Sequence, residues 1–392
     1  MTNTTKWVIG VVIVLVVVIG LVQANKKDSN QPSNSDGAKS KVELSGPVKV
    51  GVILPLTGDA AAYGEPMRNA LTLAVEDVNK GGGVDGKDIT LIYEDGKCSG
   101  KDAASAASKL VNVDKVQVII GGFCSSESLA ALPVVETAKV ALFSGGSSSP
   151  DLTGKSRFFF RDYPSDASQG KVLAELTWKR GIKKVAFIQE QLDYPLGIYK
   201  AFSVRFQELG GALVKEEFPS NATDFRSSLT KLRSQNPDAL FIDTQTGAGA
   251  ERILKQLADL QWKPQLFLTD ATAADAKTME TNKVQVEGAF AAEFGTDPTS
   301  PQFMHLADSY KAKYGAEMPY ASYTQTEYDA VLIVRDAIKA VGYDGTKIAE
   351  WARTLKDWPG ASGKVTIGAD GDRAGGHIPK VVRNGKTEPV TE

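Results

Sequence analysis

The chain has 392 residues, of which 42% are hydrophobic and 23% are charged, a composition typical of a globular protein with ordinary cores. Its 45 basic and 47 acidic residues give a formal net charge of −2 without a basic block, which excludes the usual electrostatic footprint of a nucleic-acid-binding protein. Beyond an N-terminal segment, the length suits two domains of ordinary size.

The N-terminus contains an apolar segment, because every residue over 7–22 is apolar or glycine. Such a segment is an export signal or a membrane anchor, and its length does not decide between them. Residues 22–24 are compact enough for a cleavage site, whereas Lys26 and Lys27 weaken the charge contrast across the segment. We predict a signal peptide, or a transmembrane helix that anchors the protein if it is uncleaved, over residues 1–24.

An exported N-terminus places the rest of the chain outside the cytoplasm, in the periplasm or at the outer face of the cytoplasmic membrane, anchored or secreted. No cysteine directly follows the apolar segment, which excludes a lipid attachment there. Residues 25–46 are rich in Ser, Asn, Lys and Asp and are predicted to form a disordered polar tether. The folded part is expected to start near Pro47.

From Val48 onward, short β-rich runs alternate with longer helical patterns, which predicts βαβ units and parallel sheets. The apolar runs are nearly continuous, as expected of strands that helices cover on both faces. The expected strands of a first series are VKVGVILPL, ITLIYED, VQVIIGGF and VALFSGG, with helices over 65–80, 102–111 and 126–139. A second series contains KKVAFIQE, ALVKEEF, ALFIDTQ and QLFLTD, with helices over 196–209, 225–234 and 250–260.

The two series divide near residue 162, where the Pro, Ser and Asp of residues 162–166 suit a connection. The remainder contains VEGAFAAEF, helices over 301–314 and 324–341, and a strand-rich tail, and it is too small for a third lobe. It is expected to complete both lobes, so that the chain crosses between them more than once and forms the hinge of a closing cleft. We predict lobe 1 from residues 47–162 and about 295–342, and lobe 2 from residues 163–294 and about 343–392.

The two cysteines are Cys98 and Cys124, and the second stands where a hydrophobic strand is expected to turn into a helix. In an exported chain, two cysteines most simply form a disulfide bond. The alternative is a pair of separately buried thiols.

The sequence offers little for catalysis, because its two histidines, His305 and His377, stand near no obvious nucleophile. It has no Gly-x-Ser-x-Gly elbow, no Walker-type phosphate loop and too few His and Cys for a zinc site. Gly81 to Gly83 follow a helix and indicate a helix stop, while Asp370-Gly371-Asp372 lacks the ligand pattern of a calcium loop and indicates a turn. We expect no enzyme activity, no cofactor and no metal.

Polar groups gather where the predicted strands end, which is where open α/β sheets bind ligands. Ser125 and Ser126 begin a predicted helix, whose free N–H groups and dipole favour a carboxylate, although a serine there is also a common helix cap. The loop over residues 145–149 offers backbone groups and hydroxyls, or is only a flexible loop. Asp270 ends the run QLFLTD, so its carboxylate is placed to hold an ammonium group across the cleft or to cap a following helix.

Five segments of the chain are informative when they are taken together: VGVILPLTGDAAAYGEPMRNALTLAVEDVNKGGGVDG, YEDGKCSGKDAASAASKLV, VIIGGFCSSESLAALPV, ALFSGGSSSPDL and FRDYPSDASQG. They resemble the leucine/isoleucine/valine-binding family of substrate-binding proteins that serve ABC importers. The resemblance runs from about residue 48 to residue 386. It implies the periplasmic binding protein type I fold, which is α/β with two Rossmann-like lobes, parallel central sheets, a three-crossover hinge and a disulfide matching Cys98 and Cys124.

The resemblance also implies ligand contacts in the first lobe. By position, Ser125 would receive the ligand carboxylate through its hydroxyl and backbone N–H. Gly146 and Ser148 would contribute a backbone carbonyl and a hydroxyl, with Ser126 and Ser147 beside them.

Further ligand contacts are implied around the cleft. Tyr63 and Tyr194 match aromatic positions that line it, although a core role is an equal alternative for both. Asp270 falls where the branched-chain binders carry an acidic residue for the ligand ammonium. At Gln245 and Thr246 those binders place an aromatic residue, so this chain departs from the family there, and a polar ligand becomes an alternative.

We therefore expect an exported solute-binding protein, a monomer, that captures an amino acid, branched-chain or related, and delivers it to an ABC permease with its ATPase. The alternatives are a ligand-sensing ectodomain-like receptor and a binder of amides or urea in the same fold.

Overall fold

The computed structural model describes residues 46–390. The predicted signal or anchor over 1–24 and the predicted tether lie outside the described residues, apart from Gly46. Within the part that is described, no helix combines the length and the apolar character that crossing a membrane requires.

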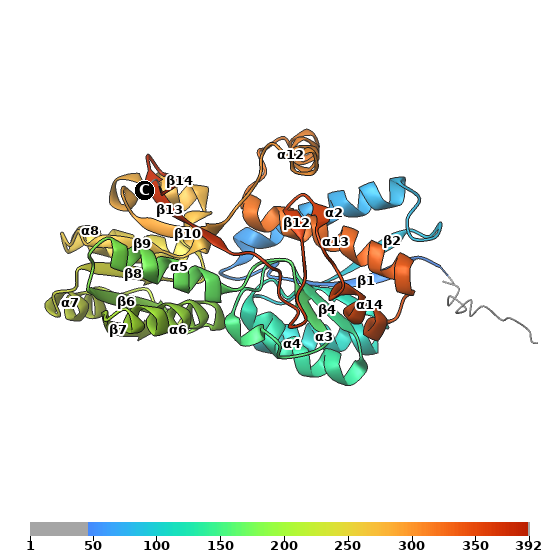
Figure 1. The fold of residues 1–392 in the computed structure, drawn as a ribbon, viewed down its shortest axis with the longest axis horizontal. Helices are drawn as coiled ribbons and strands as arrows, with labels where there is room; N and C mark the ends of the chain where they lie inside the picture. Colours follow the sequence, from blue (N-terminus) through green and yellow to red (C-terminus); the bar gives the residue numbers. More distant parts are fainter. Residues whose placement is uncertain (1–45, 391–392) are drawn as a thin grey trace, which may run out of the picture. The chain divides into compact units, whose positions relative to one another are not determined.

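The first sheet has five strands, all parallel, as the alternation of strand and helix patterns predicted. Every residue of β3 and β4 is buried, which explains why their sequences are almost entirely apolar. The strands are, in spatial order, β2 (Ile89–Asp95), β1 (Val48–Leu54), β3 (Val118–Ile120), β4 (Ala141–Ser144) and β5 (Phe159–Arg161). The helices between them are α2 (Ala61–Lys80), α3 (Gly100–Asn112) and α4 (Ser125–Ala138), grouped with these strands in Figure 1.

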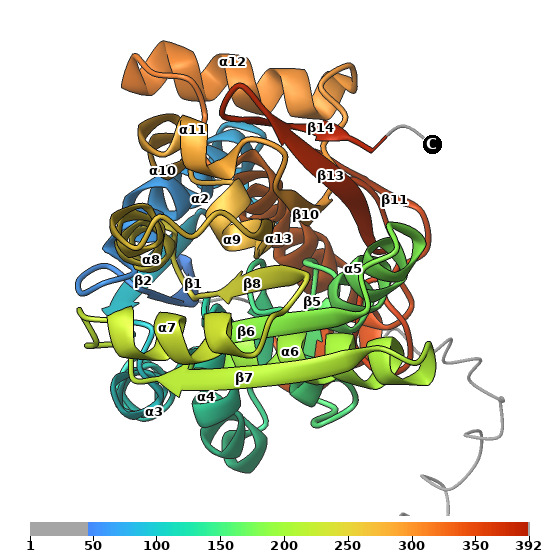
Figure 2. The same ribbon diagram turned by 90° about the vertical axis from the view of Figure 1, so that its left-hand side faces the viewer.

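The second sheet has seven strands and is parallel except at one edge, where β13 runs antiparallel to both of its neighbours. In spatial order the strands are β14 (Lys386–Pro389), β13 (His377–Arg383), β10 (Phe290–Phe294), β9 (Gln265–Leu268), β8 (Ala239–Asp243), β6 (Lys184–Glu190) and β7 (Ala212–Phe218). Figure 2 shows β8, β6 and β7 side by side. The helices of this series are α5 (Asp166–Lys179), α6 (Asp193–Glu208), α7 (Arg226–Ser234) and α8 (Gly247–Asp259).

The chain passes between the two sheets three times, after β5, after β10 and before β13, which confirms the expected three-crossover arrangement. After β10, the chain returns to the first sheet, because α13 (Ala321–Val341) packs on α2 and α14 (Gly345–Ala352) packs on β4. The lobe boundaries remain a proposal, and the contacts of α14 favour assigning it to lobe 1 rather than lobe 2. The remaining elements are η1 (Pro150–Leu152), α9 (Asp270–Ala273), α10 (Ala276–Thr281), α11 (Lys283–Val286), α12 (Pro301–Tyr314), β11 (Trp358–Gly360) and β12 (Gly363–Val365).

Some helices begin earlier than their sequence pattern predicts. Ala61 opens α2 and Asp193 opens α6, so Tyr63 and Tyr194 lie in the first turns of helices rather than in the loops that precede them. No pattern predicted α5, because its first half, DASQG, is polar and small and reads as a continued connection. The expected helix stop is confirmed, since α2 ends at Lys80 with Gly81 as its C-cap.

Candidate functional site

The N-terminus of α4 is fixed by the two cysteines and one buried carboxylate. Ser125 is the first residue of the helix, so Ser125 and Ser126 begin it as predicted, but the N-cap is Cys124 rather than a serine. Cys98 and Cys124 form a disulfide bond, with their Cα atoms 5.3 Å apart, so the alternative of two separate thiols is wrong. The Glu127 carboxylate accepts hydrogen bonds from the backbone N–H groups of Cys98 and Cys124, both at 2.9 Å. The first N–H groups of an α-helix have no partner within the helix, so this fixed terminus presents backbone donors that suit an anionic group.

The serine-rich loop after β4 folds against this helix terminus. Ser149 N donates to Ser125 Oγ at 3.0 Å, and a Cβ atom on Gly146 would lie 2.5 Å from Phe123, so only glycine fits there. The Ser147 hydroxyl is 2.8 Å from Gly122 O and also contacts Ser128 Oγ. We therefore propose that Ser147 holds the two loops together, and that Gly146 and Ser148 are the ligand contacts.

Two buried glutamates lie beneath the loop. Burial raises the pKa of Glu127 to about 7 and the pKa of Glu327, in α13, to about 8. The carbonyl of Gly145 accepts a hydrogen bond from Thr326 Oγ1 at 2.7 Å, which fixes the loop on the same helix. Because Glu327 is mostly protonated at neutral pH, it adds little negative charge where an anion would bind.

Asp270 lies on the other side of the site and is the first residue of the short helix α9, which Thr269 caps. Its carboxylate accepts hydrogen bonds from the hydroxyls of Tyr163 at 2.6 Å, Tyr323 at 2.7 Å, and Tyr194. Burial, and then the neighbouring Asp270, raise the pKa of all three tyrosines well above the usual value, so they remain donors. A carboxylate offers about four acceptor positions, which leaves one for a further donor such as an ammonium group.

Asp166 and His377 stand behind Asp270. The His377 Nε2 atom lies 3.9 Å from Asp166 Oδ1 and 4.0 Å from Asp270 Oδ2. Burial lowers the pKa of His377 to about 4, so its imidazole is neutral at physiological pH. Burial and the nearby Asp270 raise the pKa of Asp166 well above its usual value.

The two sides enclose a hollow of about 20 Å³, which has room for about one water molecule. Tyr63 of α2 spans the hollow and donates a hydrogen bond to Ala271 O, in α9, at 3.3 Å. Six of the predicted site residues line it, together with four that were not predicted. The ten are Tyr63, Ser125, Gly146, Ser148, Tyr194 and Gln245, and then Phe123, Cys124, Ala271 and Tyr323.

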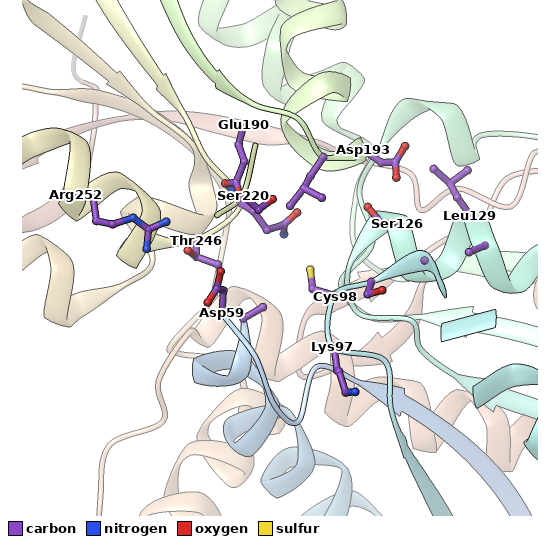
Figure 3. Close-up of a pocket in the computed structure, with 16 residues that line it drawn as sticks. Asp59, Lys97, Cys98, Ser126, Leu129, Glu190, Asp193, Ser220, Thr246 and Arg252 are labelled. Carbon is purple, nitrogen blue, oxygen red and sulfur yellow. The ribbon is translucent and has the colours of Figure 1, made fainter. Parts of the chain in front are cut away.

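A larger chamber of about 710 Å³ lies next to the hollow, and Gln245 lines both. Figure 3 shows Glu190, Thr246 and Arg252 entering it from the second series of elements, and Ser126, Leu129 and Lys97 entering from the first. The Gln245 backbone N–H donates to Glu190 Oε2 at 2.9 Å, and Thr246 caps α8 through Gly249 N at 3.1 Å. The polar pair Gln245 and Thr246 therefore lies at the junction of hollow and chamber.

Arg161 holds the serine-rich loop in place through hydrogen bonds to its backbone carbonyls. Its guanidinium is fully buried and donates to Ser149 O at 2.9 Å, to Ser147 O at 3.2 Å and to Asp372 Oδ1 at 2.8 Å. Asp372 lies in the turn predicted at residues 370–372, on the segment that leads to β13. One side chain thus connects the loop after β4 with the last crossing between the sheets.

Replacing Asp372 by Asn is expected to lower the free energy of unfolding by about 1.5 to 3 kcal/mol, because Arg161 keeps a hydrogen-bond acceptor but loses its counter-charge. Urea denaturation measures the change. Asp259→Asn, on the exposed surface of α8, is a matched control that should change stability by less than about 0.5 kcal/mol. Equal stability of the Asp372→Asn variant and the parent would contradict this role.

Residues 46–390 contain no candidate metal site, because no three His, Cys, Asp or Glu side chains among them lie close enough together to hold an ion. His305 is exposed on α12 and bonded to Asp77, at 2.8 Å.

A family model described as periplasmic binding protein matches residues 47–379 of this chain. The chain belongs to the periplasmic binding protein family. This confirms the resemblance on which the sequence interpretation rested. As members of that family are extracytoplasmic solute-binding components of ABC transporters, this chain has a solute-binding role and an extracytoplasmic location.

Individual relatives agree with the family assignment. A Leu/Ile/Val-binding protein of Rhizobium johnstonii is 27% identical over 336 residues, which are 83% of this chain and 88% of the relative. The crystal structure of a leucine binding protein, LivK, from Thermotoga maritima is 30% identical with a TM-score of 0.81, and the match covers 88% of this chain and 98% of that one. LivJ of Streptococcus pneumoniae, solved in complex with isoleucine, is 26% identical with a TM-score of 0.75, over 87% and 98% of the two chains. All three relatives are described as binding proteins.

Sequence reasoning missed several groups around Asp270. Tyr163 lies in RDYPSD, which was interpreted only as a connection between the lobes. Tyr323 comes from α13, far along the chain, and reaches the site only because the chain crosses back to the first sheet. Both tyrosines stand next to a segment in which the chain passes from one sheet to the other. A tyrosine at such a place could have been predicted to direct its hydroxyl into the cleft.

Proposed function

We propose that this protein captures an α-amino acid, branched-chain or related, in the cleft between its two sheets and delivers it to an ABC permease with its ATPase. The observation that supports this most directly is that the N-terminus of α4 and the tyrosines that hold Asp270 face one hollow from opposite sides. The N-terminus of α4 and the loop at Gly146 and Ser148 offer donors for a carboxylate. On the opposite side, Tyr194 and Tyr323 line the hollow and donate to the carboxylate of Asp270, which does not itself line the hollow and offers an acceptor for an ammonium group when the cleft opens.

Closure of the cleft would be the signal that the permease recognises. An amino acid is larger than the hollow of about 20 Å³, so the two sides must separate for entry and close around the ligand. A ligand shifts this equilibrium only by its differential affinity for the closed form. Contacts to both its carboxylate and its ammonium supply that difference, because the two groups meet opposite sides.

A thermal-shift screen tests this function. The purified full chain, unfolded and refolded to remove bound ligand, is measured against the twenty amino acids, small amides, urea and short carboxylates. An amino acid at a hundred times its Kd is expected to add about 2.7 kcal/mol of stability. Stabilisation by amides or urea alone would remove Asp270 as an ammonium partner, and a screen without any shift would contradict the proposed ligand class.

We further propose a monomer, held at the membrane or released depending on whether residues 1–24 are cleaved. A sensing receptor remains the alternative role for the same fold. Permease and ATPase genes beside this one would favour import, whereas a kinase or chemoreceptor gene would favour sensing.

A further inference from the structure

The chamber beside the hollow is large for the side chain of a branched-chain amino acid. Its volume of about 710 Å³ lies within the range of about 300 to 1,000 Å³ that is typical of whole small-molecule sites. The hollow and the chamber share part of their walls. Gln245 lines both of them, and the disulfide lies between them, with Cys124 lining the hollow and Cys98 lining the chamber. A ligand anchored by its carboxylate and ammonium in the hollow therefore has room to extend into the chamber.

Three polar atoms of the chamber residues are buried and have no hydrogen-bond partner within the described part of the chain. They are Ser126 Oγ, Gln245 Oε1 and Arg252 Nε. Ser126 belongs to the first series of elements, and the other two belong to the second. A buried polar atom without a partner destabilises the protein, so a ligand that supplies the missing donors and acceptor is favoured over an aliphatic one.

The charges of the chamber favour a neutral ligand group. Charged side chains of both signs line it, of which Asp59, Glu190 and Asp193 are acidic and Lys97 and Arg252 are basic. Neither an anionic nor a cationic ligand group therefore meets surroundings of uniformly opposite charge. A group that both donates and accepts hydrogen bonds without a net charge satisfies Gln245 Oε1 and Arg252 Nε together.

We propose that the ligand is an α-amino acid with a long, neutral, polar side chain that ends in a carboxamide or ureido group and reaches from the hollow to Gln245. This inference rests on the proposed function. Gln245 then acts as the specificity-determining residue, and its side chain takes the place where the resemblance implied an aromatic one.

Isothermal titration of the refolded full chain with glutamine, citrulline, leucine, glutamate and lysine tests the proposal. Glutamine or citrulline is expected to bind at least about tenfold more tightly than the other three, because a site built for hydrogen bonds rejects ligands that lack them. Tightest binding of leucine would overturn the side-chain class while the amino-acid function stands. Tightest binding of glutamate or lysine would overturn the charge argument, and the failure of all five to bind would contradict the proposed function itself.

A variant pair locates the effect. Gln245→Leu is expected to weaken glutamine binding by about tenfold or more and to leave leucine binding equal or stronger. Gln207→Leu, on the exposed face of α6, is the matched control and should bind as the parent does. Thermal unfolding of both variants confirms that they are folded. Unchanged glutamine affinity in folded Gln245→Leu would overturn the role of Gln245.

Discussion

Replacing Asp270 by Asn is expected to weaken amino-acid binding by about 2 to 5 kcal/mol, which is roughly 30- to 5,000-fold in Kd. The carboxamide keeps an oxygen for the hydroxyls of Tyr163 and Tyr323, so the hydrogen bonds among the tyrosines survive in part. The negative charge that faces the ligand ammonium is lost. Calorimetric titration with the ligand found in the screen measures the change.

The matched control for this variant is Asp308→Asn, which makes the same chemical change on the exposed face of α12. It should bind as the parent does. Asp270→Ala removes the acceptor of three buried hydroxyls as well, so it is expected to lose stability in addition to affinity. If folded Asp270→Asn binds the amino acid as tightly as the parent, the ammonium role of Asp270 is wrong.

Reduction of the disulfide is expected to lower the free energy of unfolding by about 3.5 kcal/mol. The bond closes a loop of 26 residues, and chain entropy predicts a loss of that size when such a loop is opened. Guanidinium denaturation with and without dithiothreitol measures it. Ligand affinity should fall as well, because Cys124 is the N-cap of α4 and the bond fixes the helix terminus that we propose as the carboxylate site.

The double variant Cys98→Ala/Cys124→Ala is the control for side effects of the reductant. Without any reductant, its free energy of unfolding should already be as low as that of the reduced parent, and dithiothreitol should not change it further. Two titratable thiols in the unfolded parent protein, together with stability that reduction does not change, would contradict the bond.

The first half of the site was accessible from the sequence because its elements are contiguous. Ser125 follows directly on a buried strand, and the glycine and serines of the next strand's loop meet it, since parallel strands end at one edge of their sheet. Within each series, short connections join consecutive strands and helices, so consecutive strands are expected to lie close to one another in the sheet. The pattern of strands and helices was therefore enough to bring Ser125 and the loop over residues 145–149 together, whereas the choice of Gly146 and Ser148 within that loop came from the family resemblance.

The second half could not be predicted in the same way. Asp270 was selected as a strand-end carboxylate, but its partners Tyr163 and Tyr323 come from two different crossings between the sheets. Nothing in the local pattern of residues specifies which crossing lies beside which strand. The antiparallel return of β13, which brings His377 within 4.0 Å of Asp270, is likewise a consequence of tertiary structure.

The raised pKa values of Glu127 and Glu327 couple folding to proton uptake. Both carboxyls titrate near their ordinary value of 4.5 in the unfolded chain, but at about 7 and about 8 in the folded one. Between those values the folded protein binds more protons than the unfolded chain, so the contribution of the pair to stability is complete in acid and is lost as the pH rises through 7 to 8. The two carboxyls therefore stabilise the serine-rich side of the cleft most below about pH 4.5, and in alkaline surroundings that contribution is gone.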